Sequence, residues 1–335
     1  MKHLVYIGNK LAHKGNTAST IDTLGRHFEG LGYKVTYASS KQHIVLRFID
    51  MLWTVLKQRK TADFVLIDTY STLNFYYALA VSQLCRVLRL KYIPILHGGN
   101  LPNRLNSHPK LSRLLFRHSH VNISPSEYIK HHFEIKGYLC KVIPNSIAIS
   151  QYEFNSRAID EVKLLWVRSF SKIYNPTLAV DILDALKAKG YNASLCMVGP
   201  DKDGSLETTK AYAKSKALDV TFTGGLTKSE WISLSKNYNV FINTTNFDNM
   251  PVSVIEAMAL GLPIISTNVG GLPFLIHHKK DGLLVLPNQV EGFVSAVQQV
   301  KEDHSFLEAI TKHARTKAER YDWQQVKDQW LSILK

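Results

Sequence analysis

Residues 246–271 read NFDNMPVSVIEAMALGLPIISTNVGG and carry two acids, Asp248 and Glu256, eight positions apart. Asp248 lies in a polar turn, whereas Glu256 lies in a helical pattern over residues 252–260 that is otherwise almost wholly apolar. A helix that is apolar on every side is a buried helix. Because an isolated buried carboxylate is costly or takes up a proton, Glu256 needs hydrogen-bond donors. The hydroxyl groups of a bound sugar or ribose would serve, and so would backbone groups of the protein.

The polar turn before this helix has the features of an anion site. Asn249 is placed to cap the helix, and Pro251 suits its first turn. Asp248 would then lie beside a helix N-terminus, whose free N–H groups attract phosphate. After the following strand, Gly270 and Gly271 permit a close approach of the backbone. We therefore expect either a site for phosphate and hydroxyl groups or an ordinary capping turn.

Strand and helix patterns alternate along the whole chain. Apolar runs such as HLVYIG, FVLIDTY, KLLWVRS and VFINTT are continuous, as expected for parallel strands that are covered on both faces. Together with the longer helical patterns between them, they predict a doubly wound α/β fold. The series runs twice, on either side of a polar break at residues 145–162.

The length and this repetition predict two Rossmann-like domains, residues 1–150 and 160–320. In such folds the carboxyl ends of the strands surround the ligand, so we expect the two sheets to face a common cleft. The last helical pattern, about residues 321–335, has no strand after it and is free to pack back on the first domain.

The charge of the chain is uneven. The 335 residues include 41 Lys and Arg against 27 Asp and Glu, a net charge of +14. Residues 1–160 hold 21 of the basic and 9 of the acidic residues, a net charge of +12. Such a basic half indicates an anionic partner, namely lipid headgroups, phosphates or nucleic acid, or else solvated charge without a partner. The sequence has no helix-turn-helix, zinc or aromatic stacking motif, so nucleic acid is not expected.

The expected compartment is the cytoplasm. The three cysteines are far apart and lack metal-ligand spacing, as in a reducing environment. The apolar start is too short for a signal peptide, and the longest uncharged segment, residues 69–85, is too polar to span a membrane. Two basic amphipathic segments, residues 44–60 and 104–120, are candidates for peripheral contact with the inner face of the cell membrane. A core-facing helix with a solvated basic face is the alternative for each segment.

The stretch at 246–271 resembles the signature of the family 4 retaining glycosyltransferases. That signature is Glu, seven residues and Glu, followed by AMA.GLP, a strand and VGG. The resemblance implies the GT-B fold, in which the C-terminal Rossmann-like domain holds most of a nucleotide-sugar donor. It also implies that Glu256 accepts from the ribose hydroxyls and that Asp248, in place of the family's first Glu, contacts the transferred sugar. The backbone expected against the sugar and phosphates is that of Asn249, Met250, Pro251 and Val252.

Two basic residues follow the first strand of the second half, in KLLWVRSFSKIYNP. The family usually has an Arg here and a Lys five or six residues later, so Arg168 is expected to bind the diphosphate. Lys172 stands only four residues on and is either a second phosphate ligand or a solvated surface residue. These cations would stabilise charge on the leaving diphosphate. Because these cations can themselves stabilise the leaving diphosphate, we expect no metal, and no cofactor besides the donor substrate.

Three further positions are candidates through the same resemblance. His97 follows the apolar strand YIPIL and is expected to face the site, where it would orient a substrate hydroxyl. A histidine that only completes a strand end is the alternative. Gly15 belongs to a glycine-containing loop after the first strand; this loop lacks a dinucleotide fingerprint, so a plain turn is equally compatible. Gly224 in FTGGLTKSE would lie next to the nucleobase.

These observations predict a metal-independent, retaining hexosyltransferase. It would move a sugar from a nucleoside-diphosphate sugar, with UDP favoured, to a hydroxyl of a lipid-linked or polysaccharide acceptor in cell-surface polysaccharide biosynthesis. An epimerase or phosphorylase on the same fold and a basic nucleic-acid-binding protein are the alternatives. The prediction fails if protein groups occupy the Glu256 carboxylate and no opening reaches it.

Overall fold

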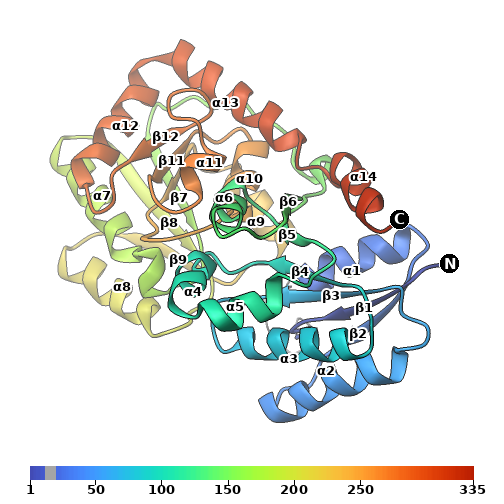
Figure 1. Cartoon of the computed structure of the whole chain (residues 1–335). Helices are drawn as coiled ribbons and strands as arrows, with labels where there is room; N and C mark the ends of the chain where they lie inside the picture. The colour runs from blue at the N-terminus through green and yellow to red at the C-terminus, as the bar shows by residue number, and fades with distance from the viewer. Residues whose placement is uncertain (12–19) are drawn as a thin grey trace. The chain divides into compact units, whose positions relative to one another are not determined.

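The computed structural model describes residues 1–11 and 20–335 (Figure 1). The chain forms two units, of which unit 1 comprises Met1–Pro144 and Leu331–Lys335 and unit 2 comprises Asn145–Trp330. Each unit contains a six-stranded sheet in which all neighbouring strands run parallel. Two parallel sheets with helices between successive strands confirm the predicted α/β fold.

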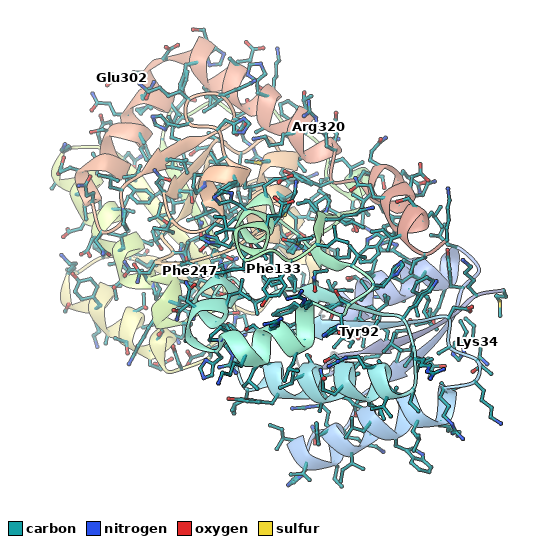
Figure 2. The ribbon with its side chains drawn as sticks, in the orientation of Figure 1. Lys34, Tyr92, Phe133, Phe247, Glu302 and Arg320 are labelled. Carbon is teal, nitrogen blue, oxygen red and sulfur yellow. The ribbon has the colours of Figure 1, made fainter. Side chains whose placement is uncertain are left out.

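The sheet of unit 1 has the strand order β2-β1-β3-β4-β5-β6. Its strands are β1 (His3–Ile7), β2 (Lys34–Ala38), β3 (Phe64–Thr69), β4 (Tyr92–Leu96), β5 (Asn122–Ser124) and β6 (Cys140–Val142). Its helices are α1 (Thr20–Gly30), α2 (Ile44–Gln58), α3 (Asn74–Val87), α4 (Leu101–Ser107), α5 (Pro109–Phe116) and α6 (Glu127–Ile135). Every residue of β1 and β3 is buried, as their continuous apolar runs predict. Tyr92 and Phe133, labelled in Figure 2, belong to the core that these elements share.

The sheet of unit 2 has the order β12-β11-β10-β7-β8-β9, which is the Rossmann order 3-2-1-4-5-6 counted from the opposite edge. Its strands are β7 (Val162–Val167), β8 (Ala193–Val198), β9 (Val220–Gly224), β10 (Val240–Asn243), β11 (Ile264–Thr267) and β12 (Leu283–Val285). Its helices are η2 (Ile149–Gln151), η3 (Lys172–Tyr174), α7 (Pro176–Ala188), α8 (Ser205–Ser215), α9 (Lys228–Ser235), α10 (Val252–Ala259), α11 (Leu272–Leu275), α12 (Val290–Glu302), α13 (His304–Glu319) and α14 (Trp323–Ile333).

Both faces of the sheet in unit 2 are covered by apolar side chains. On β7, Leu164 and Trp166 belong to one buried cluster, whereas Leu165 between them belongs to another. Because successive side chains of a strand point to opposite faces, the two clusters lie on opposite sides of the sheet. Helix α10 is buried from Val254 to Ala259, which confirms the buried helix predicted around Glu256.

Unit 1 is discontinuous in sequence, because its last five residues follow the whole of unit 2. The boundary falls within α14, after Trp330. Within unit 1, Lys2 Nζ donates to the carbonyl oxygen of Leu334 at 2.6 Å, so the two ends of the chain are joined there. Among the described residues, no helix has the combination of length and apolar content that crossing a bilayer requires.

Candidate active site

Two of the predicted site residues meet at the carboxyl end of the sheet in unit 2. Arg168 directly follows β7, and Asp248 lies in the loop between the neighbouring strand β10 and α10. Nη2 of Arg168 forms an ion pair with Oδ2 of Asp248, and both side chains are largely buried. The guanidinium carbon also lies 4.0 Å from the centroid of the Tyr174 ring, within the range of a cation–π contact. The ion pair of Arg168 and Asp248 therefore lies at the position where a sugar diphosphate is predicted to bind.

Helix α10 begins without a side-chain cap. Its N-cap residue is Pro251, which makes no side-chain cap hydrogen bond. The predicted cap by Asn249 is therefore wrong, because the helix starts two residues later than such a cap requires. The backbone N–H of Asn249 instead donates to Oδ1 of Asp248 at 2.8 Å. The N-cap side chain thus supplies no acceptor to the first turn of α10, and free N–H groups at a helix start are what attract anions.

The two glycines after β11 serve contact within the protein. A Cβ at Gly270 would lie 2.2 Å from the carbonyl oxygen of Asp248, and one at Gly271 would lie 2.0 Å from that of Asn249. The N–H of Gly271 donates to the carbonyl oxygen of Asp248 at 2.9 Å. The close approach predicted for this pair is therefore an approach to the loop before α10. It holds in place the segment that carries Asp248 and the backbone of Met250, Pro251 and Val252.

Glu256 is buried on α10, with 3% of its surface exposed. Its Oε1 accepts a hydrogen bond from the Tyr152 hydroxyl at 2.8 Å and forms an ion pair with Lys228 Nζ. The carboxylate is thus bonded by protein groups, but by side chains rather than by the backbone considered as the alternative. Of the two observations that together would refute a ligand role, one is therefore present, because protein groups occupy Oε1. Both contacts use Oε1, so Oε2 is the oxygen that a ligand hydroxyl would reach.

Burial raises the pKa of Glu256, and the nearby Lys228 ammonium opposes that shift. Burial, followed by the charge of Glu256, raises the pKa of Tyr152 well above its ordinary value, so this hydroxyl is a donor. Lys228 opens α9, where Thr227 and Glu230 form a capping box that fixes the first turn. Its side chain is 49% exposed, so it reaches the buried carboxylate from the solvent.

Neither partner of Glu256 was predicted. Tyr152 is 104 positions and Lys228 is 28 positions from Glu256 in sequence. Lys228 belongs to FTGGLTKSE, the stretch expected next to the nucleobase, but no local pattern marks either residue as a partner of Glu256, because only the tertiary packing around α10 brings them together.

Lys172 begins η3 and Gly224 ends β9, both in unit 2. The N–H of Lys172 donates to Asp203 Oδ2 at 3.1 Å, while its side chain is exposed and forms no ion pair with the described residues. Hydrogen bonds from Ser205, from the N–H of Lys172 and from Ser171 lower the pKa of Asp203 to about 2. Gly224 has φ +73°, and no atom of the described residues lies within 4 Å of the position of a Cβ there. Its backbone thus borders open space.

In unit 1, His97 is held by a buried acid. His97 directly follows β4, and its Nε2 lies 2.7 Å from Oδ1 of Asp68 on the adjacent strand β3. The Tyr6 hydroxyl donates to the same oxygen at 3.0 Å, whereas Asp68 Oδ2 is buried without a partner among the described residues. A Cβ at Gly8 would lie 2.6 Å from Oδ2, so a side chain is excluded beside it. Asp68 fixes the orientation of the imidazole and leaves Nδ1 as the nitrogen for another partner.

Asp68 was not predicted as a site residue, although it is an acid within the apolar strand FVLIDTY, just as Glu256 is an acid within an apolar helix. Gly15 lies outside the described residues. Within the part of the chain that the structure describes, no three His, Cys, Asp or Glu side chains converge as metal ligands would. The absence of a metal from the reaction stays a prediction.

Residues 149–317, about half of the chain, match the family model described as "Glycosyl transferases group 1". The sulfoquinovosyl transferase SQD2 of Arabidopsis thaliana is 32% identical over 148 residues, which cover 43% of this chain and 28% of that protein. The amylovoran biosynthesis glycosyltransferase AmsK of Erwinia amylovora is 24% identical over 267 residues, covering 73% of this chain and 64% of that protein. The matches thus span less than two thirds of either relative.

Solved structures share the fold over the whole chain. The Anabaena protein HepE, in complex with UDP-glucose, has a TM-score of 0.78 over 100% of this chain and 99% of its own, at 16% sequence identity. A likeness at this identity establishes the arrangement of the backbone, and it supports the two-sheet architecture described above.

Proposed function

Because the chain belongs to the glycosyl transferases of group 1, we propose that it transfers a sugar from a nucleoside-diphosphate sugar to a hydroxyl group. The family is the one predicted from the motif at residues 246–271. We propose a uridine nucleotide as the donor and a lipid-linked or polysaccharide molecule as the acceptor. Two relatives favour these choices by analogy, since HepE was solved with UDP-glucose and AmsK is named for amylovoran biosynthesis.

The ion pair between Arg168 and Asp248 beside the uncapped start of α10 carries the proposal. The Arg168 guanidinium offers donors in a fixed fork that suits phosphate oxygens. The first turn of α10 adds backbone N–H groups directed at the same anion. In the bound state Arg168 would stabilise the charge that grows on the leaving diphosphate, and Asp248 would accept from a hydroxyl of the transferred sugar.

Glu256 would bind the ribose through Oε2. Tyr152 and Lys228 keep Oε1 occupied, and both contacts favour the ionised carboxylate, which acts purely as an acceptor. A ribose hydroxyl would therefore meet an oriented acceptor. In unit 1, His97 would use the nitrogen that Asp68 leaves unoccupied to orient a hydroxyl of the substrate.

The proposed reaction retains the configuration of the sugar and uses no covalent attachment to the protein. The acceptor oxygen would attack the anomeric carbon on the face from which the diphosphate leaves. The leaving phosphate oxygen would take up the proton of that hydroxyl as the bond to the diphosphate breaks. The residues of this chain would then act by positioning the donor and stabilising the leaving charge.

The test combines donor binding with matched variants. A thermal-shift screen of uridine, guanosine and adenosine diphosphate sugars should give a selective rise in Tm with the correct donor, because a ligand stabilises the folded state that binds it. Glu256→Ala and Arg168→Ala should abolish this rise and the transfer or hydrolysis of the donor. Glu302→Ala and Arg320→Ala change exposed residues labelled in Figure 2 and should leave both readouts unchanged.

Donor binding and turnover that survive in both site variants would refute the assignment. Product analysis with the donor alone separates transfer from the alternative reactions. An epimerised nucleotide sugar, or a sugar phosphate formed with inorganic phosphate, would replace the proposed activity by the epimerase or phosphorylase alternative.

A further inference from the structure

Helix α2 of unit 1 carries an apolar surface that faces the solvent. Only Met51 and Val55 among its residues are buried, and both belong to the core of unit 1. The exposed apolar side chains of the helix, each between 36% and 60% exposed, are Ile44, Val45, Leu46, Phe48, Ile49, Trp53 and Leu56. We call these seven side chains the α2 face. A gathering of large apolar groups in water marks a contact surface rather than ordinary scatter.

Four members of the α2 face line one side of the helix. Val45, Ile49 and Trp53 recur every four residues, and Leu56 follows Ile49 by seven, so they line one side. Ile44 and Phe48 lie instead on the stripe of Met51 and Val55, at spacings of four, three and four residues. This stripe is exposed at its first two positions and packs on the sheet at its last two, where α2 contacts β1 and β2. Along another side α2 contacts α3, beside which it is seen in Figure 1. The described residues of unit 1 therefore leave the α2 face uncovered.

The α2 face is bordered by positive charge. Residues 41–60 contain five Lys and Arg and one acid, Asp50, a net charge of +4. The four exposed cations are Lys41 before the helix, Lys57 in its last turn, and Arg59 and Lys60 after it. Long basic side chains can extend from an apolar boundary to the phosphates above it. An apolar side with Trp and Phe and a border of Lys and Arg has the chemistry of a helix that lies in the interface of an anionic bilayer.

The other basic amphipathic segment, residues 104–120, does not expose its apolar side chains in this way. In α5, Leu115 and Phe116 are buried in the core, and Leu111 packs against it. Only Leu114 among the leucines of α5 is strongly exposed. The core-facing alternative therefore holds for this segment, although its sequence pattern is similar. The contrast shows that the exposure of the α2 face is particular to α2.

We propose that the α2 face docks on an anionic lipid bilayer. Its apolar side chains would enter the boundary between headgroups and acyl chains, and its flanking Lys and Arg would bind the headgroup phosphates. The helix would lie on the bilayer rather than cross it, since its 15 residues fall short of the roughly 20 that a spanning helix needs. No residue of the proposed transfer site lies on α2, so this surface adds a function to that reaction.

Trp53 provides a built-in probe of the contact. The chain has five tryptophans, and the other four, Trp166, Trp231, Trp323 and Trp330, are buried. We expect vesicles containing phosphatidylglycerol to shift the fluorescence of the full chain to shorter wavelength and lipids with brominated acyl chains to quench it. Phosphatidylcholine vesicles should do so much more weakly, and salt should weaken the response to the anionic vesicles. Unchanged emission, with no flotation on anionic vesicles at low salt, would overturn the proposal.

A matched pair of variants locates the surface. Val45→Glu combined with Ile49→Glu replaces exposed side chains and should leave the circular dichroism and Tm unchanged while weakening partition to anionic vesicles more than tenfold. Leu139→Glu makes the same kind of change at a residue 65% exposed that precedes β6, at the opposite edge of the sheet from β2. This control should partition as the unaltered chain does. Equal losses in the two variants, or no loss in the first, would contradict the assignment of the α2 face.

Two further measurements test the contribution of the flanking positive charge and the possibility that a second copy of the chain covers the α2 face. Lys57→Glu with Lys60→Glu should remove the preference for anionic lipid, because it reverses the charge beside the face and retains the apolar groups. A dimer in gel filtration that the Val45→Glu/Ile49→Glu variant dissociates, together with absence of vesicle binding, would show that a second copy covers the face instead. None of these readouts measures donor binding or sugar transfer, so their outcomes are independent of whether the proposed reaction is correct.

Discussion

Replacing Tyr152 by Phe tests the bonding of the buried carboxylate of Glu256. The change removes one hydroxyl, which donates to Glu256 Oε1 at 2.8 Å, and it retains the shape of the ring. A hydrogen bond to a charged group contributes about 1.5–3 kcal/mol, and solvent has little access to replace this one because both residues are buried. Since Lys228 continues to pair with the carboxylate, we expect the free energy of unfolding of unit 2 to fall by about 2 kcal/mol. For a domain of this size that corresponds to a fall of about 4–8 °C in Tm.

The effect of Tyr152→Phe should depend on pH. Burial raises the pKa of Glu256 in the folded state above its ordinary value of 4.5, so this group stabilises the folded state fully below that value. The stabilisation is lost as pH rises through the folded pKa. The Tyr152 hydrogen bond favours the ionised form, so its removal raises the folded pKa further. The difference between the two proteins is therefore largest above the folded pKa and shrinks as pH falls through it.

Urea unfolding of the two proteins at pH values above and below this transition measures both quantities. Tyr191→Phe is the matched control, because Tyr191 is half-buried in the same unit and its hydroxyl bonds to none of the described residues. The control should cost much less than Tyr152→Phe. A loss for Tyr152→Phe no larger than that of the control, or one that is constant with pH, would refute the picture of an ionised, side-chain-bonded Glu256.

Three further changes test the site. Gly271→Ala should destabilise unit 2 by more than about 2 kcal/mol, because its Cβ would lie 2.0 Å from the Asn249 carbonyl oxygen. Gly225→Ala, whose Cβ would meet nothing closer than 3.7 Å, should leave Tm nearly unchanged, and equal shifts would contradict the steric argument. Asp68→Asn should lower kcat about 10- to 100-fold with little change in KM, and it should alter the pH profile of kcat, because the substitution weakens the bond that orients His97. An unchanged pH profile would show that Asp68 has a purely structural role. Arg168→Lys keeps the charge but loses the planar fork, so steady-state kinetics should show kcat/KM about 10- to 100-fold lower. Unchanged kcat/KM would remove Arg168 from the donor site.

The fold class was predictable because it depends on patterns within short segments. Continuous apolar runs such as residues 64–69 can be buried on both faces only in a covered parallel sheet, and this strand is buried throughout. The burial of α10 followed from its apolar surroundings in the same way. The family was predictable because the motif at residues 246–271 combines several fixed spacings in one stretch.

The contacts within the site were less predictable because they join distant segments. The pairing of Arg168 with Asp248 spans 80 positions, and it depends on β7 and β10 being neighbours in the sheet. The bonds to Glu256 arise from residues whose local sequence has no distinguishing feature. The predicted cap by Asn249 failed for a local reason, since Pro251 and not Asn249 occupies the N-cap position of α10.

The helices of unit 1 show the same limit of sequence patterns. The segments at residues 44–60 and 104–120 both alternate basic and apolar residues at helical spacing. Helix α5, in the segment 104–120, buries most of its apolar side chains in the core, whereas α2, in the segment 44–60, exposes most of them. The difference arises because the two helices occupy different positions around the sheet. Periodicity predicts which side of a helix is apolar, whereas the tertiary fold decides whether that side meets protein.

The interrupted course of unit 1 determines the order in which the molecule is completed during translation. The ribosome releases residues 145–330, the entire segment of unit 2, before it releases Leu331–Lys335. Unit 1, although begun first, therefore receives its closing segment only after the whole of unit 2 has been synthesised. The bond from Lys2 to Leu334 then joins two segments of unit 1 that are synthesised on either side of unit 2.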